Sequence, residues 1–104
     1  MTIPNLHEPL RKDALKKANY AAEIVKSKYP GIELFLFGSV IWNNVFTDHS
    51  DIDIAVKGLK CSREYLKIYG YICDAVSPFD VDVVLLEEVS ENLRQRITEE
   101  GLKL

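Results

Sequence analysis

Long hydrophobic runs are missing from this sequence, and no segment approaches the ~20 consecutive apolar residues that a membrane-spanning helix needs. The first residues also lack the basic segment and the apolar stretch of a signal peptide. We therefore expect a cytoplasmic protein with no membrane partner.

Cysteine is scarce, because the chain has only Cys61 and Cys73. Nothing else in the sequence indicates secretion, and a domain of this size does not need a disulfide to be stable. We expect both thiols to be reduced.

An excess of positive charge is also missing, since 13 lysines and arginines accompany 16 aspartates and glutamates and the net charge is −3. Proteins that grip long nucleic acid usually carry a basic field. The composition therefore argues against a long nucleic acid as the partner. A small anionic ligand stays open, because bound metal ions can supply positive charge locally.

What is present is sufficient for one folded domain. The chain has 104 residues, of which 47% are hydrophobic and 28% are charged. This composition can bury one core and differs from that of a disordered chain. We expect a single domain over residues 1–104.

Apolar periodicity and turn residues predict the order helix, strand, short helix, strand, helix, strand, helix. The predicted helices are 8–29, 40–43, a helix from Ser62 to the turn at Ser77-Pro78, and a helix from Ser90 to Gly101. The predicted strands are 32–37, 51–56 and 80–86, and 44–50 is a polar loop. Ser62 and Ser90 are the expected N-caps.

Three of the predicted helices carry apolar residues at the spacing of one helical face. In residues 8–29 these are Leu15, Ala18, Ala22, Val25 and Tyr29. In the helix after Ser62 they are Tyr65, Leu66, Tyr69, Ile72 and Cys73, and in the last helix they are Leu93 and Ile97. We expect these faces to form the core.

Aspartates recur on two predicted strands. Alternate side chains of a strand share a face, so Asp51 and Asp53 are expected to lie together. Two carboxylates at this spacing repel and raise a pKa unless a cation lies between them, which favours an Mg²⁺ site over charges that merely protect an edge strand. Asp82 adds a third carboxylate if the two strands are neighbours, with Asp80 as the alternative. Three carboxylates around one or two Mg²⁺ ions suit a phosphoryl or nucleotidyl displacement.

A phosphate site is predicted at Gly38-Ser39, which follows a strand and precedes a short helix. Unhindered backbone N–H groups, a hydroxyl and a helix start are typical partners of phosphate oxygens. The alternative for this pair alone is an ordinary turn at the end of a strand, and the neighbouring aspartates favour the ligand contact.

These segments together resemble a known signature. Leu36-Phe37-Gly38-Ser39 is followed after eleven residues by an Asp-Ile-Asp-Ile segment at 51–54, as in the DNA polymerase beta nucleotidyltransferase superfamily. The chain length and the segments 79–84 and 97–101 are similar to its minimal nucleotidyltransferase (MNT) branch. The similarity begins at about Ala18 and covers nearly all of the chain.

The resemblance implies an α+β fold, with a small mixed β-sheet and helices packed mainly on one face. It implies that Gly38 and Ser39 contact a nucleoside triphosphate and that Asp51 and Asp53 bind Mg²⁺. Asp82 would complete the metal site and help to deprotonate the acceptor hydroxyl. All three aspartates are thus expected catalytic residues.

The resemblance also implies a partner. MNT proteins often pair with a helical HEPN protein as a toxin–antitoxin system, in some cases by adenylylating the toxin. The expected function is transfer of a nucleoside monophosphate, AMP from ATP, to a hydroxyl of a protein partner. The alternative is a catalytically inactive, nucleotide-binding antitoxin that acts by direct contact. Transfer to a small molecule, as in antibiotic-modifying relatives, is a weaker alternative.

The sequence departs from the family pattern after Gly-Ser. Many relatives have arginine-rich residues there, whereas this chain has Val40, Ile41 and Trp42. Lys57, or a lysine of the first helix, is the expected substitute. Trp42 is open to two interpretations, stacking on a nucleobase or packing, and His49 is expected to be an exposed loop residue. The oligomeric state stays open, a homo-oligomer included.

Overall fold

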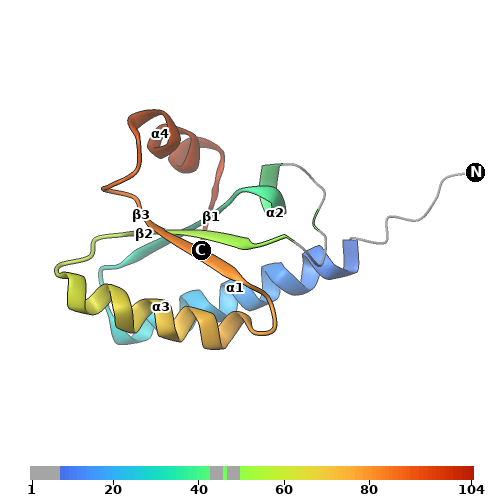
Figure 1. Cartoon of the computed structure of the whole chain (residues 1–104), viewed down its shortest axis with the longest axis horizontal. Helices are drawn as coiled ribbons and strands as arrows, with labels where there is room; N and C mark the ends of the chain where they lie inside the picture. The colour runs from blue at the N-terminus through green and yellow to red at the C-terminus, as the bar shows by residue number, and fades with distance from the viewer. Residues whose placement is uncertain (1–7, 43–45, 47–49) are drawn as a thin grey trace, which may run out of the picture.

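The computed structural model describes residues 8–42, 46 and 50–104. Its helices are α1 (Glu8–Lys28), α2 (Ser39–Trp42), α3 (Ser62–Val76) and α4 (Glu91–Glu100), and its strands are β1 (Glu33–Phe37), β2 (Ile52–Lys57), β3 (Val81–Leu85) and β4 (Leu102–Lys103) (Figure 1). The predicted order is confirmed, and β4 is an addition that the sequence did not predict. Asn43, His49 and most of the predicted loop 44–50 lie outside the described residues.

The strands form one sheet in the order β3-β2-β1-β4. β1 is antiparallel to both β2 and β4, whereas β2 and β3 are parallel. Parallel neighbours need a long crossover connection, which α3 supplies between β2 and β3. The mixed sheet with helices confirms the predicted α+β fold.

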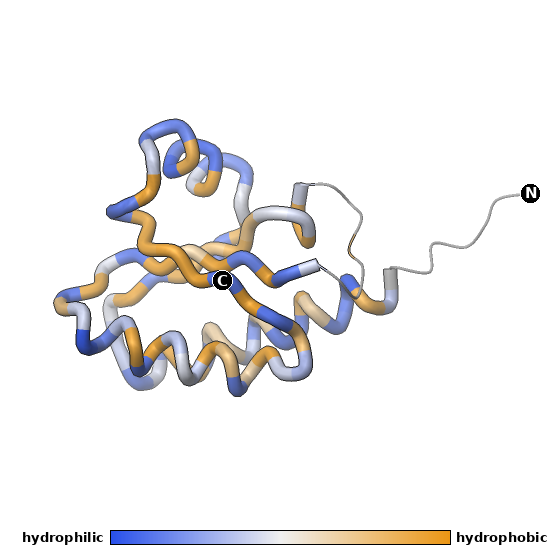
Figure 2. The backbone as a smooth tube through the Cα atoms, in the orientation of Figure 1, coloured by the Kyte–Doolittle hydropathy of each residue, from blue (hydrophilic) through white to orange (hydrophobic). Residues whose placement is uncertain are grey.

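The helices cover the two faces of the sheet unequally. The long helices α1 and α3 lie side by side on one face, and α4 lies on the other (Figure 1). Figure 2 shows apolar residues along the strands and alternating polar and apolar residues along the helices. Strand residues that face α1 and α3 include Leu34, Leu36, Ile52, Ile54 and Val56, and those on the α4 side include Phe35, Phe37 and Ala55.

The core faces of α1 and α4 agree with the predictions. Ala18, Ala22 and Val25 are buried, and Ile97 is fully buried in α4. The two outer positions of the α1 face, Leu15 and Tyr29, and Leu93 of α4 are partly buried and pack against the core.

The predicted core face of α3 is partly wrong. Ile72 is buried as expected, but Leu66 is 71% exposed and Tyr69 is 38% exposed. The buried residues of α3 are Ile68, Ile72, Ala75 and Val76. This helix carries apolar residues around most of its circumference, so its periodicity alone fits more than one core face.

One of the two predicted N-caps is confirmed and the other is wrong. The Ser90 hydroxyl accepts a hydrogen bond from Leu93 N at 3.2 Å, which confirms it as the cap of α4. Ser62 is instead the first residue of α3, and the N-cap is Cys61, which makes no side-chain cap hydrogen bond.

Both cysteines are free. Cys61 precedes α3 and Cys73 lies near its end, so the helix separates them by ~18 Å, which is beyond the reach of a disulfide. Among the described residues, no helix combines the length and the apolar character needed to cross a membrane.

Candidate active site

The site is built at the end of the sheet where β1 ends and β2 and β3 begin. Asp53 is the second residue of β2 and is in register with Asp82 of β3 on one side and with Phe37 of β1 on the other. Neighbouring strands are ~4.8 Å apart, so Asp53 and Asp82 are side by side. Because Ile52 and Ile54 face α1 and α3, both aspartates project on the α4 side. The prediction that these strands are neighbours is confirmed.

Asp51 and Asp80 lie just before the strands. Asp51 precedes β2 and is exposed, so only Asp53 has the strand geometry expected for the pair. Asp80 is also exposed and precedes β3, where its carbonyl accepts a hydrogen bond from Ile52 N at 2.9 Å. The register thus places Asp82, rather than Asp80, beside Asp53.

The charge of Asp53 is held in an unfavourable environment. Burial is the main cause that raises the pKa of Asp53 to about 6, and the negative charges of Asp82 and Asp51 raise it further. Ionised Asp53 therefore costs free energy unless a cation or a proton compensates for it.

Gly38 lies directly against Asp53. Its φ is 79°, and a Cβ atom at this position would be 2.9 Å from Asp53 Cγ and would overlap Oδ2. The Gly38 carbonyl accepts hydrogen bonds from Ile41 N at 3.0 Å and Trp42 N at 2.7 Å, which close the first turn of α2. Ser39, partly buried, is the first residue of α2. The Gly-Ser turn and the carboxylates thus form one structural unit.

Comparison with known families identifies this unit. A family model described as polymerase beta, nucleotidyltransferase matches residues 19–104, a range that includes the Gly-Ser turn and all the aspartates above. The chain belongs to this nucleotidyltransferase family. The domain indicates a role in nucleotidyl transfer. A search of curated proteins found no significant match.

Mg²⁺ is the metal that nucleotidyl transfer implies, and the donor chemistry of the nucleotidyltransferase site fits it. In the described ranges, 8–42, 46 and 50–104, no three His, Cys, Asp or Glu side chains converge enough to hold a metal ion unaided. Mg²⁺ does not require such a cage, because proteins commonly hold it through one or two carboxylates, substrate phosphate oxygens and waters. Asp53 and Asp82 supply two hard oxygen donors side by side, and Asp51 adds negative charge that acts on Asp53.

Of the two expected substitutes for the missing basic residue, Lys57 does not lie near the Gly-Ser turn. Lys57 is at the opposite end of β2 from Asp53 and pairs with Glu33 at 3.7 Å. Arginines from two other helices reach α2 instead. Arg11 Nε of α1 donates to Val40 O at 2.7 Å, and the Arg96 guanidinium of α4 lies 3.8 Å from the centre of the Trp42 ring.

Local sequence patterns could not have identified these arginines. Arg96 is distant from Trp42 in the chain and reaches it only because α4 packs on the sheet face beside α2. Arg11 lies in a helix whose other basic residues are typical of a solvent-exposed face. The closest signal was the expectation that a lysine of the first helix replaces the missing basic residue, and this expectation named neither arginine.

Trp42 packs within the nucleotidyltransferase domain. One neighbour of its ring is Phe37, with ring centres 5.7 Å apart, and another is Arg96. Its Nε1 is buried and has no hydrogen-bond partner in the described part of the chain. The geometry supports the packing interpretation over stacking on a nucleobase.

Tyr69 of α3 was expected in the core, but it lies beside a hollow next to the paired aspartates rather than at the Gly-Ser turn itself. With Cys73, Asp51 and Asp80 it lines a hollow of about 500 Å³ beside the start of β3. A hydrogen bond with Cys73 is the main cause that raises the pKa of Tyr69, and the charge of Asp82 contributes. Its spacing on α3 fits a core face as well as an exposed face, so periodicity does not separate the two.

Proposed function

We propose that this chain is an Mg²⁺-dependent nucleotidyltransferase of the MNT type. It transfers AMP from ATP to a hydroxyl of a protein partner, and it acts in the cytoplasm as the antitoxin of a HEPN toxin. Asp51, Asp53 and Asp82 would hold one or two Mg²⁺ ions, and Gly38 and Ser39 would contact the triphosphate.

The observation that carries the proposal is the contact between the Gly-Ser turn and the paired carboxylates. Gly38 is packed against Asp53, and Asp53 is in register with Asp82. A phosphate bound at the turn is therefore beside both carboxylates. Bound Mg²⁺ would neutralise triphosphate charge and polarise the attacked phosphorus centre.

The remaining chemistry is assigned to the residues of the chain. The acceptor hydroxyl oxygen forms a bond to the α-phosphorus of ATP, the bond to pyrophosphate breaks, and the hydroxyl proton passes to a carboxylate. Asp82 is the base in this proposal, because it is the more exposed of the two paired aspartates and can be approached by an acceptor. Asp53, partly buried, is the residue held in a fixed position.

The test is a transfer assay with ATP labelled at the α-phosphate, Mg²⁺, the protein and a HEPN partner. Label should appear in the partner and should be lost with Asp53→Asn and with Asp82→Asn. The exposed α3 variant Asp74→Asn is the matched control and should transfer normally. Transfer that persists in both site variants would rule the mechanism out.

The second candidate is an antitoxin that binds nucleotide but acts only by contact with its toxin. It is favoured by the apolar residues that follow Ser39, which are Val40, Ile41 and Trp42. It is also favoured by the packing of Trp42 against Phe37, which leaves the ring unsuited to stacking on a nucleobase. A protection assay separates the two. If Asp53→Ala still forms the complex but no longer protects against the toxin, the result supports transfer. If protection is unchanged, the result supports the contact mechanism.

A further inference from the structure

β3 is an edge strand of the sheet, and the N–H groups on its outer side are available. On its inner side, Asp80 O accepts from Ile52 N and Leu86 N donates to Val56 O, each at 2.9 Å. Backbone groups alternate between the two sides of a strand. The groups of the odd-numbered residues of β3, which are Val81, Val83 and Leu85, therefore point away from β2.

Few of these outer groups have a partner. Val83 O accepts from the Tyr65 hydroxyl at 3.1 Å, and Leu85 O accepts from Glu88 N at 2.9 Å. Within the described residues nothing bonds to the outer N–H groups of Val81, Val83 and Leu85. Natural proteins often protect an edge with charged residues, proline or a bulge, and the Val-Asp-Val-Val-Leu sequence of β3 has no lysine or proline and only one charge, Asp82.

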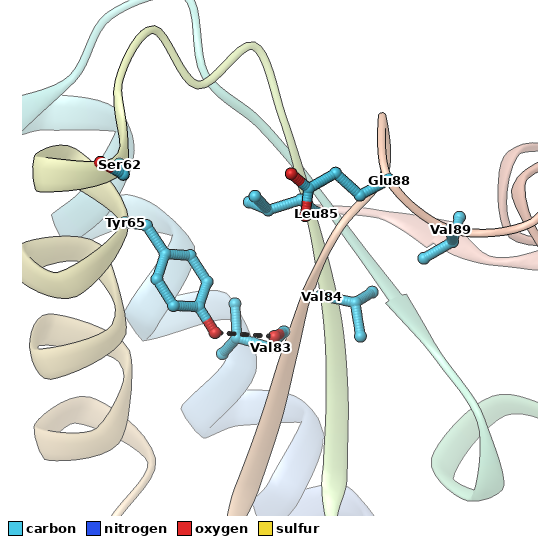
Figure 3. Close-up of a pocket in the computed structure, with 7 residues that line it drawn as sticks. All are labelled: Ser62, Tyr65, Val83, Val84, Leu85, Glu88 and Val89. Carbon is cyan, nitrogen blue, oxygen red and sulfur yellow. Dashed lines mark hydrogen bonds between the residues drawn. The ribbon is translucent and has the colours of Figure 1, made fainter.

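A hollow of about 500 Å³ runs along this edge. Figure 3 shows Tyr65 of α3 on one side and Val84 and Val89 on the other, with the dashed hydrogen bond from Tyr65 to Val83. Its walls are mainly apolar side chains, and it continues to Glu88 beyond the end of β3. An added strand could place its side chains in this space.

The charges along the edge of β3 indicate which kind of segment can bind there. Asp80 and Asp82 lie at its start, and Glu87 and Glu88 lie just after its end, all four exposed. A second copy pairing antiparallel would place the first acidic pair of one chain near the second acidic pair of the other. The edge is instead complementary to an extended segment with an apolar centre and lysine or arginine at its ends.

We propose that the outer edge of β3 binds such a basic, extended segment of a protein partner by strand addition. The inference rests on the proposed function in one respect, which is that this segment carries the acceptor hydroxyl. An added strand lies ~4.8 Å from β3, and its residue opposite Asp82 projects on the same face of the sheet. A serine, threonine or tyrosine at that position presents its hydroxyl to the third carboxylate.

The probe is an end-blocked octapeptide of alternating valine and threonine between terminal lysines, added to the whole chain. Amide hydrogen exchange is measured by NMR at millimolar peptide. The outer amides of Val81, Val83 and Leu85 should exchange at least tenfold more slowly. The inner amides of Asp82 and Val84, which point toward β2, should change less than twofold.

Matched peptides and variants test the charge and the edge separately. The same peptide with terminal glutamates should give no protection. Val83→Pro removes one outer N–H and leaves the inner ladder, so it should weaken binding at least tenfold. If that variant does not fold, Glu88→Lys, an exposed change, should weaken the lysine peptide and strengthen the glutamate peptide.

Three results would contradict the proposal. One is the absence of alternating protection, another is equal protection by both peptides, and the third is concentration-dependent protection without peptide, which would indicate a second copy of the chain. Failure of the proposed function and failure of the docking edge give different results. Peptide that binds the edge but receives no AMP contradicts transfer alone, and transfer to a partner that Val83→Pro and Glu88→Lys leave unchanged contradicts the docking edge alone.

Discussion

Asp53 is partly buried, and the charges of two other aspartates act on it. Its pKa is raised from 3.8 to about 6, so between these values the folded protein binds more protons than the unfolded chain. Under that condition the free energy of unfolding falls as the pH rises through this window. The stabilising contribution is complete below pH 3.8 and is lost at neutral pH.

Asp53→Asn should therefore be more stable than the wild type at pH 7.5 without Mg²⁺. We expect about 1 kcal/mol, because access of solvent reduces the larger value that the shift alone would give. The advantage should vanish below pH 4. Urea unfolding at both pH values measures it, with Asp74→Asn as the control, and an Asn variant that gains no stability at pH 7.5 would contradict the electrostatic account.

Gly38 has a positive φ and is in contact with Asp53, so two costs combine at one position. Gly38→Ala should destabilise the fold by about 2 kcal/mol or more, because a left-handed backbone and an overlap with a carboxylate are both unfavourable. It should also abolish Mg²⁺-dependent nucleotide binding by displacing the Asp53 side chain.

Gly31→Ala is the matched control for that variant. Gly31 also has a positive φ, 97°, but a Cβ atom there meets nothing within 4 Å. It should lose about 1 kcal/mol from backbone strain and keep nucleotide binding. Equal effects of the two substitutions in chemical unfolding and in binding would show that the contact with Asp53 is unimportant.

Among the elements, α4 is connected to the turn after β3 by one arginine. Arg94 donates from Nε to Leu86 O at 2.9 Å and from Nη2 to Glu87 O at 3.0 Å, and it pairs with Glu91 at 2.6 Å. Arg94→Ala should destabilise the fold by about 2 kcal/mol, since the backbone carbonyls of Leu86, Glu87 and Val89 lose a charged donor.

The effect of Arg94→Ala should be localised to α4. Amide exchange should accelerate in α4 and much less in α1 and α3, which pack on the other face of the sheet. Arg63→Ala, an exposed change on α3, serves as the reference for loss of a positive charge. Uniform acceleration in all helices would contradict a local anchoring role.

Elements with one clear periodicity were predicted well from the sequence, and ambiguous ones were not. α1 has one apolar stripe and strands β1 to β3 are bounded by turns, so their positions agree with the structure. α3 has apolar residues on several faces, so its core face was assigned wrongly at Leu66 and Tyr69. β4 spans only Leu102–Lys103, too short for any alternation to be recognised.

The site as a whole depends on pairing between strands that are distant in the chain. The sequence could place Asp82 on a strand, but only the register β2 to β3 shows that it is opposite Asp53. The positions of Arg11 and Arg96 beside α2 likewise follow from helix packing on both faces of the sheet. The metal and phosphate roles of the predicted residues stay predictions.

Isothermal titration of ATP into the protein, with and without Mg²⁺, tests whether the paired aspartates form a metal-dependent nucleotide site, with Asp53→Asn and Asp82→Asn as site variants and Asp74→Asn as the control. ATP binding should require Mg²⁺, should be weakened at least tenfold in both site variants and should be unchanged in the control. Binding that is independent of Mg²⁺ and of both aspartates, or no binding at millimolar ATP, would contradict such a site.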